Sequence, residues 1–518
     1  MNSTVLRRAV SMLLMAFLVL WVFTPADAQV SAMKDLDAFI EKAMQDWQVP
    51  GLAVALVKDD RVVHLRGYGV RELGKTEAVD ENTIFPIGSA SKAFTSTAVG
   101  LLVQDGKLSW DDRVIDHLPG FQLYDPWVTR EITVRDLLAN RGGLSGLSEF
   151  LWYATDHSRD EVVRRLRYVR PDSSFRSQYA YRNVMFLTAG QVAAAVTGTS
   201  WDAVLRERIF TPLGMSRSST SVRDIQGREN VTTPHMIIDG KLTPVPFRNI
   251  DNIGPAGSVN ASITDMARWL RFHLGAGVLD GRRIANAAVI RETHTPHTPI
   301  PLSEEFEAAF PSGRRLDYCL AWVRIDALGD WYVYHNGQID GIYAVISFIP
   351  EKQVGVVVLT NLENHKLSDV VFRRAIDVLL DRTPQDWNAV YLANKKKQDA
   401  RSEEARRAME ASRIQGTAPS HPLAAYAGTY ENEMYGRVTV SLEGDRLVLR
   451  LSSHLIGDMS PWQYDTFRAT LRDRVAEARL GPTFVTFAAD TKGTVSSVNL
   501  SDALTFARVP EPKPGATK

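Results

Sequence analysis

Two strand-rich regions, separated by a long helical one, constrain the fold of this chain most. Residues 51–70 predict two strands around the turn Lys58-Asp59-Asp60. Strand patterns return at 318–326, 331–336, 343–350 and 354–361, and capped helical stripes lie between, at 132–140, 159–169 and 262–274. Helices are also predicted at 31–47 and 368–380. Because the strands follow one another through short turns, we expect one antiparallel sheet built from distant parts of the chain. The predicted fold class is α+β, with helices flanking the sheet and a mostly helical insert.

The C-terminal part predicts a separate β-domain. Residues 394–413 mix Lys, Arg and Glu with few large apolar residues, which is typical of a solvated helical linker rather than a nucleic-acid arm. Beyond Pro419, residues 438–451 predict a hairpin around Gly444-Asp445. Residues 483–490 and 497–509 continue the strand pattern, so 421–512 predicts an all-β barrel or sandwich. The predicted divisions are a signal segment at 1–28, an α+β domain at 29–385, a charged helical linker at 386–420 and a β-domain at 421–518.

The first 28 residues have the pattern of a secretory signal peptide. Arg7 and Arg8 precede an apolar run at 9–23, and Ala26-Asp27-Ala28 provides a small-x-small cleavage site. The run is shorter than the roughly 20 residues that a membrane-spanning helix needs. No cysteine follows the run, which argues against a lipid anchor. We expect a mature chain that begins at Gln29, has no transmembrane anchor and is periplasmic or secreted.

Charge and cysteine content exclude some partners and sites. Lys+Arg and Asp+Glu both total 60, which leaves no basic footprint for nucleic acid. Cys319 is the single cysteine, so no disulfide can form within the chain, and its apolar neighbours predict a buried packing role. His294 and His297 lie in a loop-like segment without obvious partner ligands, so we expect surface histidines and no metal site.

Ser89 and Lys92 stand where a loop is predicted to become a helix. A lysine three residues on lies one helical turn away on the same face, and it can take the serine proton if burial lowers its pKa toward neutrality. The same spacing occurs at Ser31 and Lys34, which have no such setting. From the residues alone, Ser89 is either a nucleophile or an ordinary helix cap.

The text around Ser89 resembles a known family. PIGSASKAF is similar to the first motif of the serine β-lactamases and penicillin-binding proteins. Further segments resemble the branch that contains class C β-lactamases, D-Ala-D-Ala carboxypeptidases, D-aminopeptidases and esterases. They are ITVRDLLANRGGL (132–144), YRNVMFLTAGQVAAAVTG (181–198), RIFTPLGMSRSS (208–219) and HNGQIDGIYAVISFIP (335–350), in family order. The resemblance covers about 35 to 385, and 421–512 resembles a small β-domain often appended to this family, whose role would be to cover the active site, limit access or mediate assembly.

The resemblance implies roles for the matching residues. Ser89 would be the acylated nucleophile, and Lys92 its proton acceptor or the stabiliser of that acceptor. Tyr181 would pass protons to the leaving group and activate water for deacylation, if Lys92 held its pKa well below the usual ~10. The alternative for Tyr181 is a core aromatic. Asn183 would hydrogen-bond Lys92 or a substrate amide, or else is a turn residue.

The third motif of the family falls on residues 335–338. The backbone N–H groups of Ser89 and Gln338 would form the oxyanion hole, and Gly337 would allow a close approach of the substrate backbone. Many members have Lys-Thr-Gly here, whereas this chain has His335, which is mostly neutral at pH 7 and poorly suited to a substrate carboxylate. Potent β-lactamase activity is therefore not expected. No glutamate motif is placed as in class A enzymes, so deacylation would depend on Tyr181.

The resemblance implies an exported serine hydrolase that acts through an acyl-enzyme and needs no cofactor. Its substrate would be a small molecule or peptide with an amide or ester bond, such as a D-amino-acid-containing peptide or a small ester. One alternative is a catalytically weak β-lactam- or peptide-binding sensor of the same fold. Another is that the β-domain is the working part and the larger domain a scaffold. The oligomeric state is not predicted.

Overall fold

An eight-stranded antiparallel sheet forms the centre of the larger domain in the computed structural model, which describes residues 25–310, 313–501 and 504–510. Its strand order is β2-β1-β14-β13-β12-β11-β10-β9. The strands are β1 (Gly51–Lys58), β2 (Arg61–Gly69), β9 (Thr298–Pro299), β10 (Arg315–Tyr318), β11 (Val323–Ala327), β12 (Asp330–Ile339), β13 (Ile342–Ile349) and β14 (Val354–Thr360). Since β1 pairs with β14, segments from both ends of the domain meet inside one sheet, and the predicted α+β fold is confirmed.

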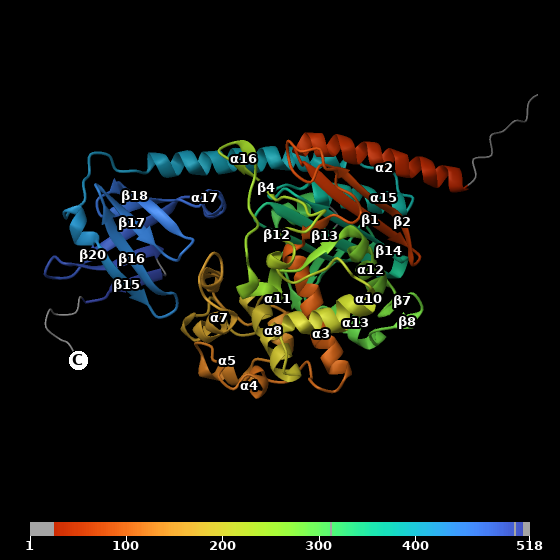
Figure 1. Ribbon diagram of the computed structural model, residues 1–518, viewed down its shortest axis with the longest axis horizontal. Helices are drawn as coiled ribbons and strands as arrows, with labels where there is room; N and C mark the ends of the chain where they lie inside the picture. Colours follow the sequence, from red (N-terminus) through yellow and green to blue (C-terminus); the bar gives the residue numbers. More distant parts are fainter. Residues whose placement is uncertain (1–24, 311–312, 502–503, 511–518) are drawn as a thin grey trace, which may run out of the picture.

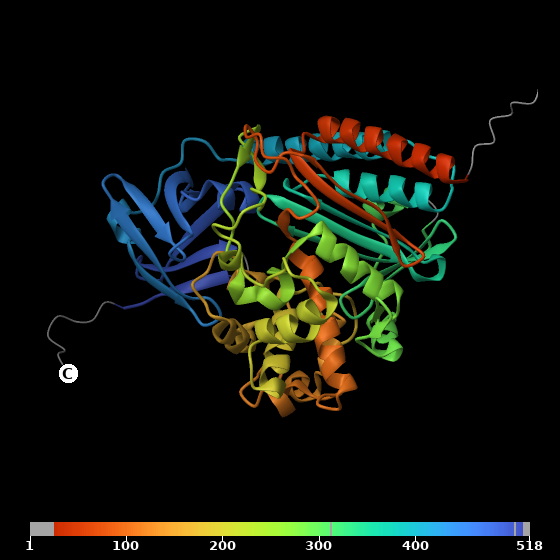
Figure 2. The ribbon, with the colours of Figure 1, turned by 45° about the vertical axis from the view of Figure 1, so that its right-hand side comes forward.

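Helices cover both faces of this sheet (Figures 1 and 2). On one face lie α2 (Pro25–Trp47), α15 (Leu367–Leu379) and the first turns of α16 (Trp387–Ala411). On the other lie α3 (Ser91–Gln104) and α12 (Ile263–Leu274). Leu52, Val54 and Leu56 of β1 pack on the first side, and Ala53, Ala55 and Val57 on the second. A strand buried on both faces has a continuous apolar run, as residues 51–57 do.

The predicted single strand at 318–326 is wrong. β10 ends at Tyr318, the chain turns through 319–322, and β11 begins at Val323. The Cys319 N–H donates to the carbonyl of Trp322 at 2.7 Å and closes the turn. Residues 319–322 are fully buried. Their apolar composition therefore reflects a buried turn, which composition alone does not distinguish from a buried strand. Cys319 is packed in the core, as predicted.

A helical region lies beside the sheet, with short hairpins at its edges. Its helices are α4 (Val114–His117), α5 (Pro126–Glu131), α6 (Val134–Leu138), α7 (Arg159–Arg165), α8 (Asn183–Thr197), α9 (Trp201–Leu205), α10 (Thr211–Leu213), α11 (Gly254–Gly257) and α13 (Ala287–Thr293). The short helix α14 (Glu304–Ala309) instead packs through Phe306 on the sheet face that carries α2 and α15. The short strand pairs are β3 (Ile84–Pro86) with β6 (Asn260–Ser262), β4 (His235–Ile238) with β5 (Lys241–Pro244), and β7 (Val278–Leu279) with β8 (Arg282–Arg283). The β3–β6 pair anchors the chain just before α3.

Residues 1–24 of the predicted signal segment lie outside the described residues. Residues 25–28 begin α2, which continues without a break through the predicted cleavage site before Gln29. Within the described part of the chain, no helix is long and apolar enough to cross a membrane. The predicted export of the protein stays a prediction.

The C-terminal strands close into an eight-stranded barrel (blue in Figure 1). They are β15 (Gly428–Asn432), β16 (Gly436–Glu443), β17 (Arg446–Arg450), β18 (Ile456–Gln463), β19 (Thr466–Leu471), β20 (Thr483–Ala489), β21 (Val495–Ser501) and β22 (Leu504–Arg508), with α17 (Arg474–Leu480) between β19 and β20. Each strand is antiparallel to the next, and β22 pairs back with β15. Buried aromatic rings, including Tyr430, Phe467, Phe487 and Phe506, pack inside. The predicted β-domain is therefore a barrel rather than a sandwich.

The barrel docks on the larger domain through both apolar and ionic contacts. Tyr153 and Ala154, in the loop before α7, pack against Leu455, Leu471 and Ala476 of the barrel. Among the ionic contacts, Arg479 of α17 lies 3.1 Å from the carboxylate of Glu363 and 3.4 Å from that of Asp340. Both carboxylates are almost fully buried, next to the turn between β12 and β13. The barrel thus contacts the larger domain close to the end of β12.

Candidate active site

Ser89 lies in a 3₁₀ turn, Gly88–Ala90, between β3 and α3. The turn begins with Gly88 at φ +53°, a left-handed conformation that favours glycine. A Cβ on Gly88 would stand 2.6 Å from the backbone N of Gln338, so the turn also needs a glycine to touch β12. Ser89 is half-buried at the N-terminal end of α3. The sequence placed Ser89 in the first turn of the helix, and the structure places it in the 3₁₀ turn just before that helix.

Lys92 is fully buried beneath Ser89. Its Nζ donates to the Oδ1 of Asn183 at 2.6 Å and to the carbonyl oxygen of Ala256 at 2.8 Å, and it lies 2.9 Å from the Oγ of Ser89. Burial lowers the pKa of Lys92 to about 7, although the negative charge of Glu149 acts in the opposite direction. At neutral pH a large fraction of Lys92 is therefore an uncharged amine, which is the form that can accept a proton from Ser89.

Asn183 begins α8 and joins Lys92 to a glutamate that the sequence analysis missed. Glu149 accepts hydrogen bonds from the backbone N–H of Asn183 at 2.9 Å, from its Nδ2 at 2.5 Å and from the Nε1 of Trp152 at 2.7 Å. No spacing or motif around Glu149 marked it, because its relation to Asn183 exists only in the folded chain. The carbonyl of Ala256 was also missed, since a backbone acceptor has no sequence signature.

Tyr181 lies directly before α8, and its hydroxyl is hydrogen-bonded to Ser89. The Nζ of Lys92 lies 4.6 Å from the centre of the Tyr181 ring. Burial nevertheless raises the pKa of Tyr181 well above 10, and the hydrogen bond to Ser89 only partly opposes this. The role that the resemblance implies for Tyr181 as a base requires a pKa well below the usual value, and this condition is not met. The phenol is a proton donor at neutral pH.

His335 lies on β12 and is buried, with only 3% of its surface exposed. Burial, together with the charge of Lys92, lowers the pKa of His335 to about 3, so its ring is neutral at pH 7. Its Nδ1 bonds the carbonyl oxygen of Asn336, and a carbonyl only accepts, so Nδ1 carries the proton. Its Nε2 has no hydrogen-bond partner among the described residues. His335 is therefore a neutral ring whose Nε2 is a buried, unpaired acceptor among the described residues.

Gly337 and Gln338 bring β12 against the serine turn. A Cβ on Gly337 would stand 1.8 Å from the carbonyl oxygen of Ile87. The close neighbour that requires a glycine here is thus the turn that carries Ser89. The backbone of Gln338 lies beside the same turn, at Gly88, while its side-chain Nε2 donates to Asn364 at 2.8 Å. This proximity is consistent with an oxyanion hole formed by the N–H groups of Ser89 and Gln338, which stays a prediction.

The predicted surface position of His294 and His297 is wrong. His294 is half-buried, its Nε2 lies 3.0 Å from the Nδ1 of His273, and burial lowers its pKa to about 3. His297 is also half-buried, 3.1 Å from the carboxylate of Glu292. Their polar sequence neighbours conceal this packing against the core. Across the described residues, no group of three or more His, Cys, Asp or Glu side chains could hold a metal ion.

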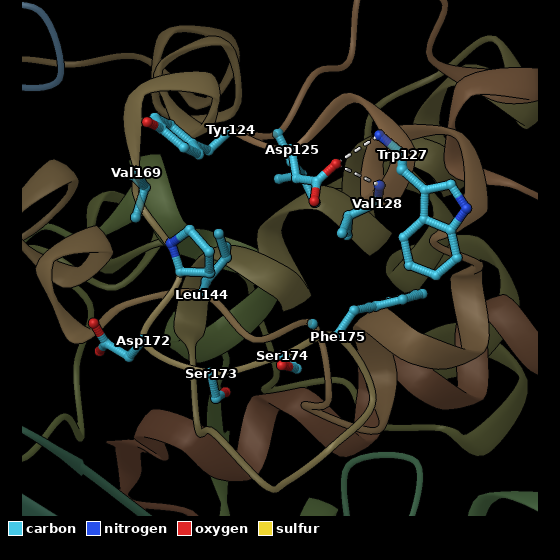
Figure 3. Close-up of a pocket in the computed structure, with 13 residues that line it drawn as sticks. Tyr124, Asp125, Trp127, Val128, Leu144, Val169, Asp172, Ser173, Ser174 and Phe175 are labelled. Atoms are coloured by element: carbon cyan, nitrogen blue, oxygen red, sulfur yellow. Dashed lines mark hydrogen bonds between the residues drawn. The ribbon is translucent and has the colours of Figure 1, made fainter.

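A hollow of about 530 Å³ lies in the helical region (Figure 3). Tyr124, Trp127 and Phe175 line it, and the rings of Trp127 and Phe175 meet edge to face. The carboxylate of Asp125 turns toward the backbone N–H groups of Trp127 and Val128, where it caps α5. None of the predicted catalytic residues is among the described residues that line this hollow. The reactive groups lie elsewhere, between α3, α8 and β12.

Comparisons with known proteins agree with this geometry. Residues 36–380 match the family described as Beta-lactamase, and residues 412–513 match the one described as Domain of unknown function (DUF3471). Unguisins hydrolase ungD of Aspergillus violaceofuscus is 28% identical over 447 residues, which cover 79% of this chain and 76% of that protein. Penicillin-binding protein 4 of Amycolatopsis lactamdurans is 30% identical over 324 residues, 60% of this chain and 81% of that protein.

The fold is shared with a solved structure. The octameric penicillin-binding protein homologue from Pyrococcus abyssi superposes with a TM-score of 0.62 at 21% identity, covering 92% of this chain and 100% of that one. The family match spans well over half of the chain and contains the Ser89–Lys92 pair, Tyr181, Asn183 and the His335 strand. The chain therefore belongs to the beta-lactamase family and is a serine hydrolase.

Proposed function

We propose that the protein hydrolyses an ester or amide through an acyl-enzyme on Ser89. The observation that carries this proposal is the 2.9 Å contact between Ser89 Oγ and the Nζ of a fully buried lysine with a pKa of about 7. Neutral Lys92 takes the serine proton as Oγ attacks the carbonyl carbon of the substrate. The backbone N–H groups of Ser89 and Gln338 receive the negative charge that develops on the carbonyl oxygen.

Tyr181 assists the leaving group. Its hydroxyl is protonated at neutral pH and hydrogen-bonded to Ser89, so it can give its proton to the departing amine or alkoxide. The proton that Lys92 took from the serine then restores the phenol. For hydrolysis of the acyl-enzyme, water attacks the same carbonyl and its proton passes to Lys92. Lys92 then returns this proton to the Ser89 oxygen as that oxygen leaves, which restores the serine hydroxyl and the neutral amine.

The charge of the site favours substrates without a carboxylate beside the scissile bond. His335 is a neutral ring rather than a cation, and Glu149 adds a negative charge behind Asn183. Arg182, the residue after Tyr181, is turned away: it donates to the carbonyl oxygens of Leu144 and Tyr181. We therefore place esters and D-amino-acid amides, in which no carboxylate is present, ahead of β-lactams and peptides that end in D-Ala-D-Ala.

A panel of substrates tests this function. Wild type and Ser89→Ala are compared on p-nitrophenyl esters, D-amino-acid amides, nitrocefin and a peptide ending in D-Ala-D-Ala, with intact-mass spectrometry to detect an acyl adduct. We expect the adduct on Ser89 and turnover of the uncharged substrates, both lost in Ser89→Ala. Absence of any adduct in wild type, or equal activity in Ser89→Ala, contradicts the proposal.

The second candidate function is a β-lactam- or peptide-binding sensor that is acylated but turns over slowly. The high pKa of Tyr181 favours it, because a protonated phenol cannot act as the base for water and deacylation then depends on Lys92 alone. An adduct that persists for hours in the same mass-spectrometric assay supports the sensor.

Export, proposed from residues 1–28, is tested by fractionating cells that express the full chain and sequencing the mature N-terminus.

A further inference from the structure

Glu149 lies behind the amide that contacts Lys92, and it acts there only as an acceptor. Its Oε1 receives the backbone N–H of Asn183, and its Oε2 receives both the Nδ2 of Asn183 and the Nε1 of Trp152. A carboxylate has no hydrogen to donate, so the group of Asn183 that faces it must be the NH₂. The amide oxygen of Asn183 is then forced to face Lys92, where it accepts at 2.6 Å.

This orientation decides where the electron pair of Lys92 points. A neutral amine has two N–H bonds and one lone pair. Lys92 Nζ has three polar neighbours: the Oδ1 of Asn183, the carbonyl oxygen of Ala256 and the hydroxyl of Ser89. The first two are acceptors, so they take the two N–H bonds. The lone pair is left facing the hydroxyl of Ser89, which is the group whose proton must be removed.

The opposite orientation of Asn183 would remove this arrangement. Its NH₂ would then face Lys92 and would donate to the lone pair, in competition with Ser89. It would also leave the ammonium form of Lys92 with one acceptor fewer. Glu149 prevents this orientation because the amide oxygen would lie against a carboxylate oxygen, with both groups carrying lone pairs.

We propose that Glu149 is a positioning residue for the hydrolase reaction, which fixes Asn183 as an acceptor and thereby aims the lone pair of neutral Lys92 at Ser89. The proposal rests on the proposed function, in which Lys92 takes the serine proton. When the Ser89 O–H bond breaks, its proton joins the Lys92 lone pair, and the serine oxygen keeps the electrons for attack on the substrate. The ammonium that forms then has an acceptor for each of its three N–H bonds.

The surroundings of Glu149 keep it in place. It lies in the 3₁₀ segment Gly146–Leu151, whose last residue is fully buried. Tyr153 and Ala154, which follow, pack against the barrel. The charge of Glu149 also raises the pKa of Lys92 against the larger effect of burial, so the carboxylate stabilises the ammonium as well as orienting the amide.

The test compares Glu149→Gln with a swapped pair. A glutamine side chain at this position turns its own NH₂ toward a donor of Asn183 or Trp152, which favours the opposite orientation of Asn183. In Glu149→Gln/Asn183→Asp, the introduced aspartate accepts from both the introduced glutamine and Lys92, so the acceptor for Lys92 is restored. Glu207→Gln is the control, since Glu207 is an exposed helical residue that pairs with the exposed Arg206.

Acylation of Ser89 is measured from pH 5 to 9 with p-nitrophenyl acetate and a fluorophosphonate probe. For Glu149→Gln we expect acylation at pH 8 to fall about tenfold or more, and the midpoint of its rise with pH to move below that of wild type. The swapped pair is expected to recover most of the rate and to return the midpoint to the wild-type value or above it. Glu207→Gln is expected to match wild type.

Each outcome decides the proposal. If Glu149→Gln is acylated at the wild-type rate and with the wild-type pH midpoint, the proposal is overturned. A slower acylation rate with an unchanged pH midpoint also overturns it, because damaged packing alone would give that result. If Glu149→Gln does not fold, the swapped pair is decisive: a folded double variant with a midpoint below that of wild type overturns the proposal. A wild type that neither probe acylates refutes the proposed function itself, whereas the other outcomes concern Glu149 alone.

Discussion

The pKa of Lys92 should determine the pH dependence of Ser89 acylation, and varying the pH of the assay tests this. The side chain is fully buried, and its pKa is about 7 instead of the usual 10.5. Only the neutral amine can take the serine proton. With a pKa of about 7, the neutral fraction is about one half at pH 7, about a tenth at pH 6 and about a hundredth at pH 5. A lysine of ordinary pKa would be neutral in fewer than about one molecule in a thousand at pH 7.

The acylation rate should follow these fractions. We expect kcat/KM to fall about fivefold from pH 7 to pH 6, to fall about tenfold more to pH 5, and to rise no more than about twofold above pH 7. The assay is the pre-steady-state burst with p-nitrophenyl acetate, with the rate of Ser89→Ala subtracted at each pH. A rate that rises about tenfold per unit up to pH 10 would refute the reasoning, since Lys92 would then titrate as an exposed lysine. A flat profile between pH 5 and 8 would show that Lys92 is not the proton acceptor.

Three further perturbations test other parts of the structure. Because the pKa of Lys92 is lowered on folding, the unfolded chain binds more protons between pH 7 and 10.5, so the free energy of unfolding rises with pH in this range. The rise is about 2 kcal/mol between pH 7 and 9, and Lys92→Met should lack it when unfolding by urea is measured at both pH values. Gly337→Ala would place its Cβ 1.8 Å from the Ile87 carbonyl oxygen, and we expect soluble protein with acylation reduced about a hundredfold or more, measured by burst amplitude and rate. Arg479→Met leaves the Glu363 carboxylate without its guanidinium. Burial raises the pKa of Glu363 to about 7, so its carboxylate is charged at pH 8 and neutral at pH 5. The free energy of unfolding of the variant should therefore be lower than that of wild type by about 2 kcal/mol or more at pH 8, and by less at pH 5. Equal losses of this free energy at the two pH values, measured by calorimetry, would contradict the reasoning.

The parts of the site that are formed by residues close together in the sequence were predictable from local sequence patterns. Ser89 and Lys92 are three residues apart on consecutive turns, and the spacing that suggested a contact is realised at 2.9 Å. The central sheet and the barrel were also predictable, because alternating or continuous apolar runs and short turns leave strong signals. The resemblance to the family supplied Tyr181, Asn183 and His335, which no local pattern would have connected to Ser89.

What escaped prediction depends on contacts between distant residues. Glu149 meets Asn183 only after the chain between them has folded back, and nothing in the segment Gly146–Leu151 marks it as special. The pKa of Tyr181 could not be inferred, because burial dominates it and burial is a property of the whole fold. The turn at 319–322 was mistaken for strand, since an apolar turn enclosed by the core has the composition of a strand.

The position of the barrel has a consequence for how the enzyme matures. The last barrel strand, Leu504–Arg508, closes the barrel by pairing with Gly428–Asn432. That barrel packs on Tyr153 and Ala154, beside the loop of Glu149, and reaches Glu363 through Arg479. A chain still under synthesis therefore has its serine and lysine long before it has their outer support. A product truncated after Leu379 would keep Ser89 and Lys92 but would lose the contacts that the barrel makes with Tyr153, Ala154 and Glu363.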